Sequence, residues 1–320
     1  TATDSISGND AANYSLTQPS GLTANITPAA LTVSTSSVSR TYDGSTLAAG
    51  TALVTSGTLY ANASNGNTVD SLSGGSFAFD TKGVGSGNKT VSVSGVTVSD
   101  GNGGSNYSVS YANNTTSTIL AKALTVSGTT VQSKTYDGTT TATLTGGTIG
   151  TSTGLVAGDT VTLTQAGSFA SANAGTGRAV TATDSISGND AANYSLTQPS
   201  GLTANITAKT LSVTGLSIAS KTYDGTTTAS VSGSPALLTA ESAGSGSTSD
   251  GAPYNVDSVS FAGSYAAAFA DKNAGTGKSI SVTGLSVTGT GAGNYVVANA
   301  SATGNILQRA LTVSGTTVQS

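Results

Sequence analysis

The chain repeats itself, and part of the repetition is letter for letter. Residues 1–27 recur without a change as residues 181–207, and residues 123–133 recur as residues 310–320. Weaker copies occupy the sequence between them. Self-similarity at a regular spacing is the signature of a repeat architecture, in which one structural module is used several times. Any fold for this chain must therefore be a fold for one module.

The spacing of the copies distinguishes two kinds of repeat protein. From Leu31 to Leu124, Leu211 and Leu311 the periods are 93, 87 and 100 residues. A β-helix repeats on a short coil, whereas units of this size that differ by loop insertions are typical of separate small domains. We therefore predict the C-terminal part of a repeat at 1–29, whole repeats at 30–122, 123–209 and 210–309, and the first strand of another repeat at 310–320.

Strand patterns dominate each repeat. Apolar and hydroxyl residues alternate at 90–93, 95–98, 160–163 and 280–282, which places one face of a strand on a core and the other in water. Gly, Asn and Asp clusters separate these runs. About seven or eight short strands per repeat suit a sandwich of two antiparallel sheets. The pattern predicts an all-β protein made of tandem, small, immunoglobulin-like β-sandwich domains, with β-grasp-like modules as the alternative.

A tyrosine that opens a late strand favours the immunoglobulin-like topology. It follows an asparagine in every copy, at Tyr14, Tyr107, Tyr194 and Tyr295. This arrangement resembles the tyrosine corner of immunoglobulin-like domains, whose hydroxyl binds back to the backbone.

The composition excludes several functions. The chain has no Cys and no His, so the common nucleophile and base pairs cannot be assembled, and we predict that it is not an enzyme. Its net charge is −4 and its 11 basic residues are scattered, which argues against nucleic-acid binding. No apolar run approaches the roughly 20 residues that cross a bilayer, so we expect no membrane span in this sequence.

A Tyr-Asp-Gly motif occurs once in each whole repeat. We predict a turn formed by Asp and Gly, with Gly free to adopt positive φ, while Tyr packs against the core or the next repeat. A ligand-binding loop is the less favoured interpretation. The residues are Tyr42, Asp43 and Gly44, then Tyr136, Asp137 and Gly138, then Tyr223, Asp224 and Gly225.

Other loops offer weaker candidates, and we predict no cofactor. The segments at 173–178 and 273–278 are glycine-rich but lack the Gly-Lys-Ser/Thr ending of a phosphate loop. The segment at 100–106 supplies a single carboxylate, too few for a typical calcium site. The turns at Asp190, Asp250 and Asp257 are equally sparse, so calcium at the junctions between repeats stays a minor alternative.

Intramolecular amide cross-links between lysine and asparagine are not expected. Such a bond needs a buried acid to move protons, and the chain has one glutamate, Glu241. In addition, the lysine of the Tyr-Asp-Gly motif, Lys134 or Lys221, is replaced by Arg40 in the first repeat.

Taken in order, several motifs resemble the YDG-type repeat domain, which occurs in tandem in very large bacterial exoproteins of the filamentous-haemagglutinin, two-partner-secretion kind. In the second repeat they lie at 134–140, 158–161, 173–178, 193–194 and 204–207. The first repeat departs from the pattern at Arg40 and at 83–89. The third has an insertion around Pro235 to Pro253.

This resemblance implies a secreted, extracellular protein of the bacterial cell surface. We expect a structural stalk or adhesion repeat that extends a rod-like array from the cell, because reach and multivalency grow with copy number. Its partners would be the neighbouring repeats of the same chain. One alternative is self-association into an extracellular filament or biofilm matrix through uncovered strand edges. Another is a carbohydrate-binding module that recognises host or cell-surface glycans, although the chain has Tyr but no Trp.

Overall fold

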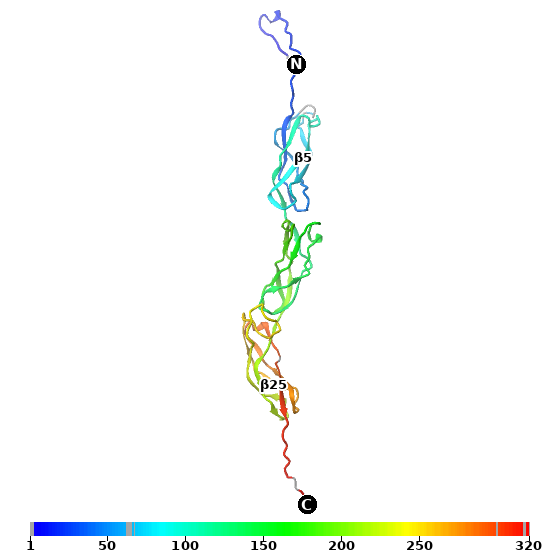
Figure 1. Ribbon diagram of the computed structural model, residues 1–320. Coiled ribbons are helices and arrows are strands. Elements are labelled where there is room, and N and C mark those ends of the chain that lie inside the picture. Colours follow the sequence, from blue (N-terminus) through cyan, green and yellow to red (C-terminus); the bar gives the residue numbers. More distant parts are fainter. Residues whose placement is uncertain (1–2, 62–65, 67, 299, 316–317, 320) are drawn as a thin grey trace. The chain divides into compact units, whose positions relative to one another are not determined.

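A computed structural model describes residues 3–61, 66, 68–298, 300–315 and 318–319. These residues form strands, turns and a few short 3-10 turns but no α-helix, so the predicted all-β class is confirmed. The chain divides into two compact units, residues 1–122 with 192–195 and residues 123–191 with 196–320. Three repeats of curled, half-barrel sheets occupy these units (Figure 1).

The first repeat has two sheets, ordered β3-β1-β6 and β2-β7-β5-β4. Its strands are β1 (Ala29–Thr35), β2 (Ser39–Thr41), β3 (Ala52–Ser56), β4 (Ser71–Phe79), β5 (Gly85–Ser99), β6 (Tyr107–Tyr111) and β7 (Asn114–Leu120). A bridge from Leu47 to Ala78 adds a further partner beside β4.

The second repeat has a five-stranded sheet ordered β10-β18-β15-β14-β11, with the pairs β12-β9, β13-β16 and β17-β8 beside it. Its strands are β8 (Lys122–Thr125), β9 (Thr130–Val131), β10 (Lys134–Thr135), β11 (Thr141–Ala142), β12 (Leu144–Thr145), β13 (Thr162–Thr164), β14 (Gly167–Phe169), β15 (Gly175–Ala182), β16 (Ser185–Ser187), β17 (Tyr194–Thr197) and β18 (Leu202–Thr207).

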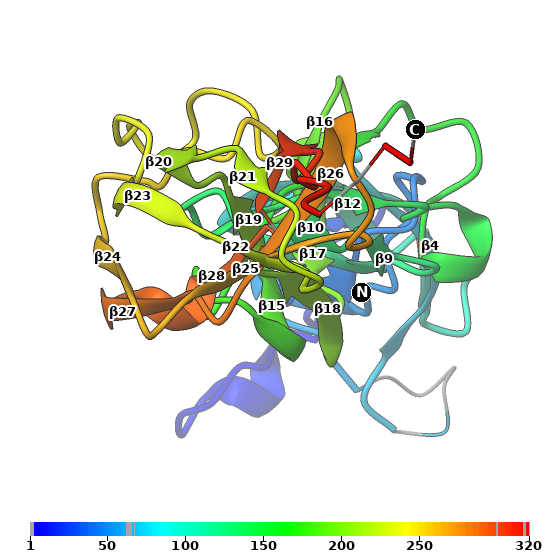
Figure 2. The same ribbon diagram turned by 90° about the horizontal axis from the view of Figure 1, so that it is seen from below.

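The third repeat has the same organisation. Its five-stranded sheet is ordered β21-β29-β26-β25-β22, with the pairs β19-β28, β20-β23 and β24-β27 (Figure 2). Its strands are β19 (Lys209–Leu211), β20 (Thr214–Ile218), β21 (Lys221–Thr222), β22 (Thr228–Ala229), β23 (Val231–Ala236), β24 (Ser258–Ala262), β25 (Ala266–Phe269), β26 (Gly275–Thr283), β27 (Ser286–Thr290), β28 (Tyr295–Val297) and β29 (Ala300–Leu307).

The alternating pattern of the sequence sets the core of each repeat. In β26, Ile280 and Val282 are buried, and the adjacent residues Ser279 and Ser281 are exposed. Phe269 and Ile306 from the neighbouring strands complete the same cluster. Because successive side chains of a strand point to opposite faces, small apolar residues at every second position supply a core while Ser and Thr face water.

The sheets of three to five strands contain both parallel and antiparallel pairs, so the prediction of antiparallel sheets is wrong. The first strand of a repeat pairs in parallel with a late one, as β1 with β6 and β19 with β28. The strand that enters the Tyr-Asp-Gly motif pairs in parallel with the last one, as β10 with β18. A parallel pair requires a long crossover between its strands, and here the rest of the repeat is that crossover.

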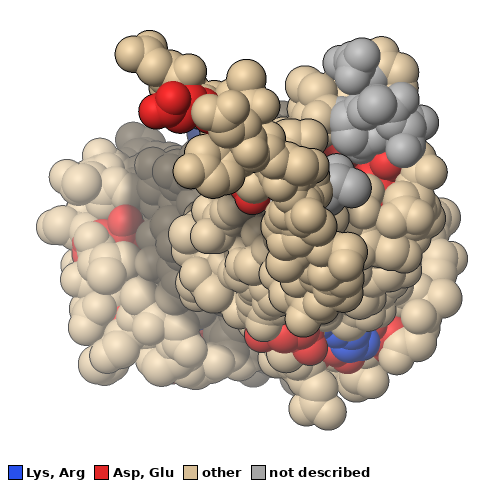
Figure 3. All heavy atoms as spheres, turned by 90° about the horizontal axis from the view of Figure 1, so that it is seen from above, with Lys and Arg blue, Asp and Glu red and all other residues tan. Residues whose placement is uncertain are grey.

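The segments at the two ends of the chain lack strands. Residues 3–28, 308–315 and 318–319 form none, including the described part of the strand predicted at 310–320, whose residues 316, 317 and 320 lie outside the described residues. None of the helices formed by the described residues is long and apolar enough for a membrane span. On the face shown in Figure 3, acidic and basic atoms occupy small separate areas among neutral ones.

Candidate functional site

The Tyr-Asp-Gly motif forms a turn closed by a lysine. In the second repeat, Lys134 Nζ lies 2.7 Å from Asp137 Oδ1 and 2.8 Å from Thr139 O. Asp137 Oδ1 also accepts the Thr139 N–H at 2.9 Å. Gly138 has a φ of 76°, in the left-handed region that favours glycine. The motif therefore has a local structural role, which is to hold one tight turn.

The third repeat has the same turn. Lys221 Nζ lies 2.9 Å from Asp224 Oδ1, which accepts the Thr226 N–H at 2.9 Å. The hydrogen bond from Lys221 and those from Thr226 lower the pKa of Asp224 to about 2. Gly225 has a φ of 81°.

In the first repeat an arginine replaces the lysine. Arg40 pairs with Asp43, Asp43 accepts the Ser45 N–H at 2.8 Å, and Gly44 has a φ of 80°. The Arg40 guanidinium lies 5.1 Å from the centre of the Phe79 ring, as Lys134 lies 5.5 Å from that of Phe169. Either cation thus joins the turn to the core.

The tyrosine of the motif reaches from the second repeat into the third, within the second unit. Tyr136 is 2% exposed, and its hydroxyl donates to Asp257 Oδ2 at 2.7 Å. Its ring packs edge to face on Tyr295 and Tyr254, with ring centres 5.4 and 5.8 Å apart. Buried residues of both repeats belong to one continuous cluster there. We call Tyr136, Tyr254, Asp257 and Tyr295 the tyrosine junction.

The tyrosine junction is completed from inside the third repeat. Tyr295 donates to the same Asp257 oxygen at 2.7 Å, and its own oxygen accepts the Tyr254 N–H at 2.9 Å. Burial and the Asp257 carboxylate together raise the pKa of both Tyr136 and Tyr295, because ionising either would place a second negative charge beside Asp257.

A second contact between these repeats uses the glycine-rich segment at 173–178. Asn294, which is buried, accepts the Ala174 N–H at 2.9 Å and donates to Asn173 Oδ1 at 3.3 Å. In addition, Gly244 N–H donates to Asp137 O at 2.8 Å. This segment therefore contacts a neighbouring repeat, and its residues 175–178 form the start of β15.

The first unit contains equivalent contacts among its own residues. Tyr42 is buried and packs edge to face on Tyr194, with ring centres 5.6 Å apart. Val84 N–H donates to Asn193 Oδ1 at 3.0 Å. In the first repeat, Tyr107 donates to Asp70 Oδ2 at 2.7 Å and accepts the Tyr60 N–H at 2.8 Å.

Two tyrosines of the repeated motifs, Tyr14 and Tyr223, are exposed. Tyr223 is 37% exposed and lines a surface hollow with Asn273, Ala274 and Leu311. Tyr14 is 73% exposed. Both lie where no neighbouring repeat covers them in the part of the chain that the structure describes.

The late-strand tyrosines bind the backbone, but not as in a tyrosine corner. Their partners lie 47 residues earlier for Tyr107 and 41 residues earlier for Tyr295, whereas a tyrosine corner closes over a few residues. The structure is therefore all-β, but these tyrosines do not establish an immunoglobulin-like sandwich.

In the acidic loop at 100–106, the carboxylate of Asp100 accepts hydrogen bonds from backbone N–H groups and is not clustered with other carboxylates among the described residues. Asp100 is fully buried, and its carboxylate accepts the N–H groups of Asn102, Gly104 and Asn106 at 2.7 to 3.1 Å. Burial alone would raise the pKa of Asp100, but these N–H groups lower it overall. The described residues contain no group of three or more His, Cys, Asp or Glu that could hold a metal ion.

Sequence reasoning missed two residues of the contacts between repeats. From the sequence, Asp257 is a minor candidate for a calcium ligand, and the asparagine before each late-strand tyrosine has no predicted role. A signal was available for both. The asparagine recurs at 13, 106, 193 and 294, and aspartate follows valine and precedes serine at 69–71 and 256–258.

The repeated turn and the buried contacts of its tyrosine define a class, a tandem array of small β-modules that share one joining motif. The YDG domain model matches residues 27–116, 120–201 and 207–304, so this chain belongs to the YDG domain family, with three repeats in tandem. No curated protein matches the chain.

Proposed function

We propose that this chain is a structural stalk or adhesion segment of a secreted bacterial surface protein, extending a rod-like array from the cell. The observation that carries the proposal is the tyrosine junction. The residue that gives the motif its first letter, Tyr136, is buried in a contact with the next repeat. Because this tyrosine is buried against the next repeat, the motif is better suited to connecting modules than to binding a ligand.

Two further properties support a mechanical role. The junction between the second and third repeats is a continuous buried cluster with three hydrogen bonds around Asp257 and Tyr295, so bending there would expose apolar surface and break polar contacts. The chain lacks His and Cys, and the proposal assigns it no catalysis. The resemblance to repeats of large bacterial exoproteins supports an extracellular setting.

Small-angle X-ray scattering tests the stalk. Chains of two, three and four repeats should show a maximum dimension that grows in proportion to repeat number, since a domain of about 100 residues adds a roughly constant length. A maximum dimension that hardly grows would contradict the proposal. Antibodies against the repeats, applied to intact cells of the source organism, test the surface location, and labelling only after lysis would exclude it.

A second candidate function is self-association into an extracellular filament or biofilm matrix. It is favoured by uncovered strand edges, such as that of β3, which pairs with β1 alone among the described strands. Analytical ultracentrifugation of the purified chain tests it, because association should increase with protein concentration. A chain that stays monomeric at the highest concentration would exclude this candidate.

The finer fold also remains a prediction. An immunoglobulin-like sandwich requires two sheets that pack face to face, and the backbone contacts of Tyr107 and Tyr295 favour closure of each repeat around one core. A crystal structure of one repeat that shows a single continuous curled sheet would contradict the immunoglobulin-like sandwich.

A further inference from the structure

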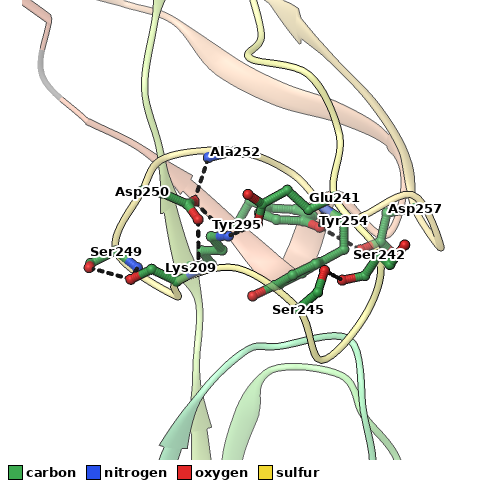
Figure 4. Close-up of polar contacts among 11 residues, drawn as sticks. Lys209, Glu241, Ser242, Ser245, Ser249, Asp250, Ala252, Tyr254, Asp257 and Tyr295 are labelled. Carbon is green, nitrogen blue, oxygen red and sulfur yellow. Dashed lines mark hydrogen bonds and ion pairs between the residues drawn. The ribbon is translucent and has the colours of Figure 1, made fainter.

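A fully buried lysine lies at the start of the third repeat. Lys209, the first residue of β19, is 0% exposed, and its Nζ lies 4.1 Å from the centre of the Tyr254 ring (Figure 4). Lysine is almost never fully buried unless it is paired, because desolvating an ammonium group is costly.

Two acids from the insertion of the third repeat approach this lysine. Asp250 Oδ1 lies 2.9 Å and Glu241 Oε2 lies 3.9 Å from Lys209 Nζ. The contact with Asp250 is close but falls outside hydrogen-bond geometry, so that neither Lys209 Nζ nor Glu241 Oε2 has a hydrogen-bond partner among the described residues. The side chains of Asp250 and Glu241 are 27% and 29% exposed, whereas Lys209 is fully buried. Ion pairing alone barely offsets the desolvation of an ammonium group that makes no hydrogen bonds, so stability gives a weak reason for this arrangement.

Backbone N–H groups hold the Asp250 carboxylate in place. Asp250 Oδ1 accepts the Ala252 N–H and Asp250 Oδ2 accepts the Ser247 N–H, both at 2.9 Å. Burial opposes the charged form, yet Lys209 and these N–H groups lower the pKa of Asp250 to about 2, so the resting state is an ion pair. The same N–H groups would stabilise an oxyanion formed at this carboxyl group.

Glycines allow the close approach of both acids. A Cβ atom at Gly246 would overlap Glu241 Oε2, and one at Gly251 would overlap Ser212 Oγ, next to β19. Both glycines have positive φ. The loop is thus shaped so that the two carboxyl groups reach Lys209.

We propose that Lys209 and Asp250 condense into an intramolecular amide cross-link, with Glu241 as the acid that moves protons. Glu241 accepts a proton from the Lys209 ammonium group and delivers it to the Asp250 carboxylate, and the freed Nζ attacks Cγ of the resulting carboxylic acid. A nitrogen–carbon bond forms, and a carbon–oxygen bond of the carboxyl group breaks. The oxygen leaves as water with the two protons that Nζ has lost, one of them delivered by Glu241. One positive and one negative charge disappear, so charge and atoms balance without a co-reactant.

The other repeats lack this arrangement. Counting two residues back from Leu31 and Leu124, the position of Lys209 is occupied by Ala29 in the first repeat and Lys122 in the second. Lys122 is only partly buried, and Glu241 is the single glutamate of the sequence. We therefore expect one cross-link, in the third repeat. It would tie the insertion to β19, and the proposal does not depend on the proposed function.

Mass spectrometry of the whole folded chain tests the cross-link. The intact mass should be one water molecule below the mass of the sequence, and a protease digest should contain one branched peptide joining the segments around Lys209 and Asp250. Lys209→Arg, Asp250→Ala and Glu241→Gln should each restore the full mass. Lys122→Arg is the matched control and should leave the loss of water unchanged.

Two results would overturn the proposal. A folded wild-type chain with the full sequence mass and no branched peptide would show that Lys209 and Asp250 form an ion pair only. A Glu241→Gln chain that still loses water would remove the role assigned to Glu241. Circular dichroism of this variant, which keeps the size of the side chain, verifies that a restored mass does not come from misfolding.

Discussion

Tyr136 and Asp257 are separated by 121 residues in the sequence and joined by a hydrogen bond of 2.7 Å. Tyr136 belongs to the Tyr-Asp-Gly motif of the second repeat, and Asp257 immediately precedes β24 in the third repeat. The contact gives the tyrosine a role distinct from that of the Asp-Gly turn beside it, since the turn is local whereas the tyrosine connects two repeats.

Tyr136→Phe should destabilise the second unit by about 1.5 to 3 kcal/mol, the usual contribution of a hydrogen bond to a charged group. The matched control is Tyr223→Phe, at the equivalent but 37% exposed position, which should change stability by less than about 0.5 kcal/mol. Urea unfolding followed by circular dichroism measures both. Equal effects of the two substitutions would contradict the role of the tyrosine junction.

Asn294→Ala should leave the Ala174 N–H without its acceptor and cost about 1 to 3 kcal/mol, the penalty for an unsatisfied buried donor. Hydrogen exchange of the Ala174 amide should accelerate. The control is Asn13→Ala, because Asn13 occupies the equivalent position but is exposed. Unchanged exchange at Ala174 in the Asn294 variant would show that this contact is not maintained in solution.

Two glycine substitutions distinguish the backbone strain of the turn from its contact with the next repeat. Gly225→Ala should reduce the free energy of unfolding by about 1 to 2 kcal/mol, the strain of a residue with a side chain in the left-handed region. Backbone strain is the whole cost here, because a Cβ at this position would meet nothing within 4 Å. Gly138→Ala should cost more, since its Cβ would lie 2.8 Å from Ala243 Cβ in the third repeat. Calorimetric unfolding of the two variants makes the comparison, and an equal loss would argue against the contact with Ala243.

The second unit should lose stability at alkaline pH. The pKa values of Tyr136 and Tyr295 are raised in the folded chain, so these groups stay protonated when unfolded tyrosines, with pKa about 10, ionise. The unfolded state then binds fewer protons, and the free energy of unfolding falls as pH rises above about 10. Thermal melting across this range should show the loss, and Tyr136→Phe should reduce it. The absorbance of tyrosinate should show these tyrosines ionising last.

Local sequence signals predicted the parts of the fold that depend on few residues. The Asp-Gly turn follows from Asp137 and Gly138, because a short acceptor side chain and a residue free to adopt positive φ suffice to form it. The alternation in β26 predicted which side chains are buried. The parallel pairing of β10 with β18 and the acceptor Asp257 could not be predicted in this way, because each depends on a partner more than 70 residues away.

The two identical segments, residues 1–27 and 181–207, show which structural features the local sequence determines. In both, the aspartate and the glutamine bind each other in the same way. Asp4 N–H donates to Gln18 Oε1 at 2.8 Å, as Asp184 N–H donates to Gln198 Oε1 at 2.8 Å. The short 3-10 turns at Ala11–Asn13 and Ala191–Asn193 also coincide. These features are settled by residues close in the chain.

The strands and the core differ between the same two copies. Residues 185–207 form β16, β17 and β18, whereas residues 5–27 form no strand. Ile206 is 1% exposed and Ile26 is 99% exposed, although their neighbours in sequence are the same over the whole segment. The sequence alone determined turns and the apolar pattern. Tertiary structure decided which residues become strand and core, because a strand needs hydrogen bonds from a partner and an apolar side chain needs a surface against which to be buried.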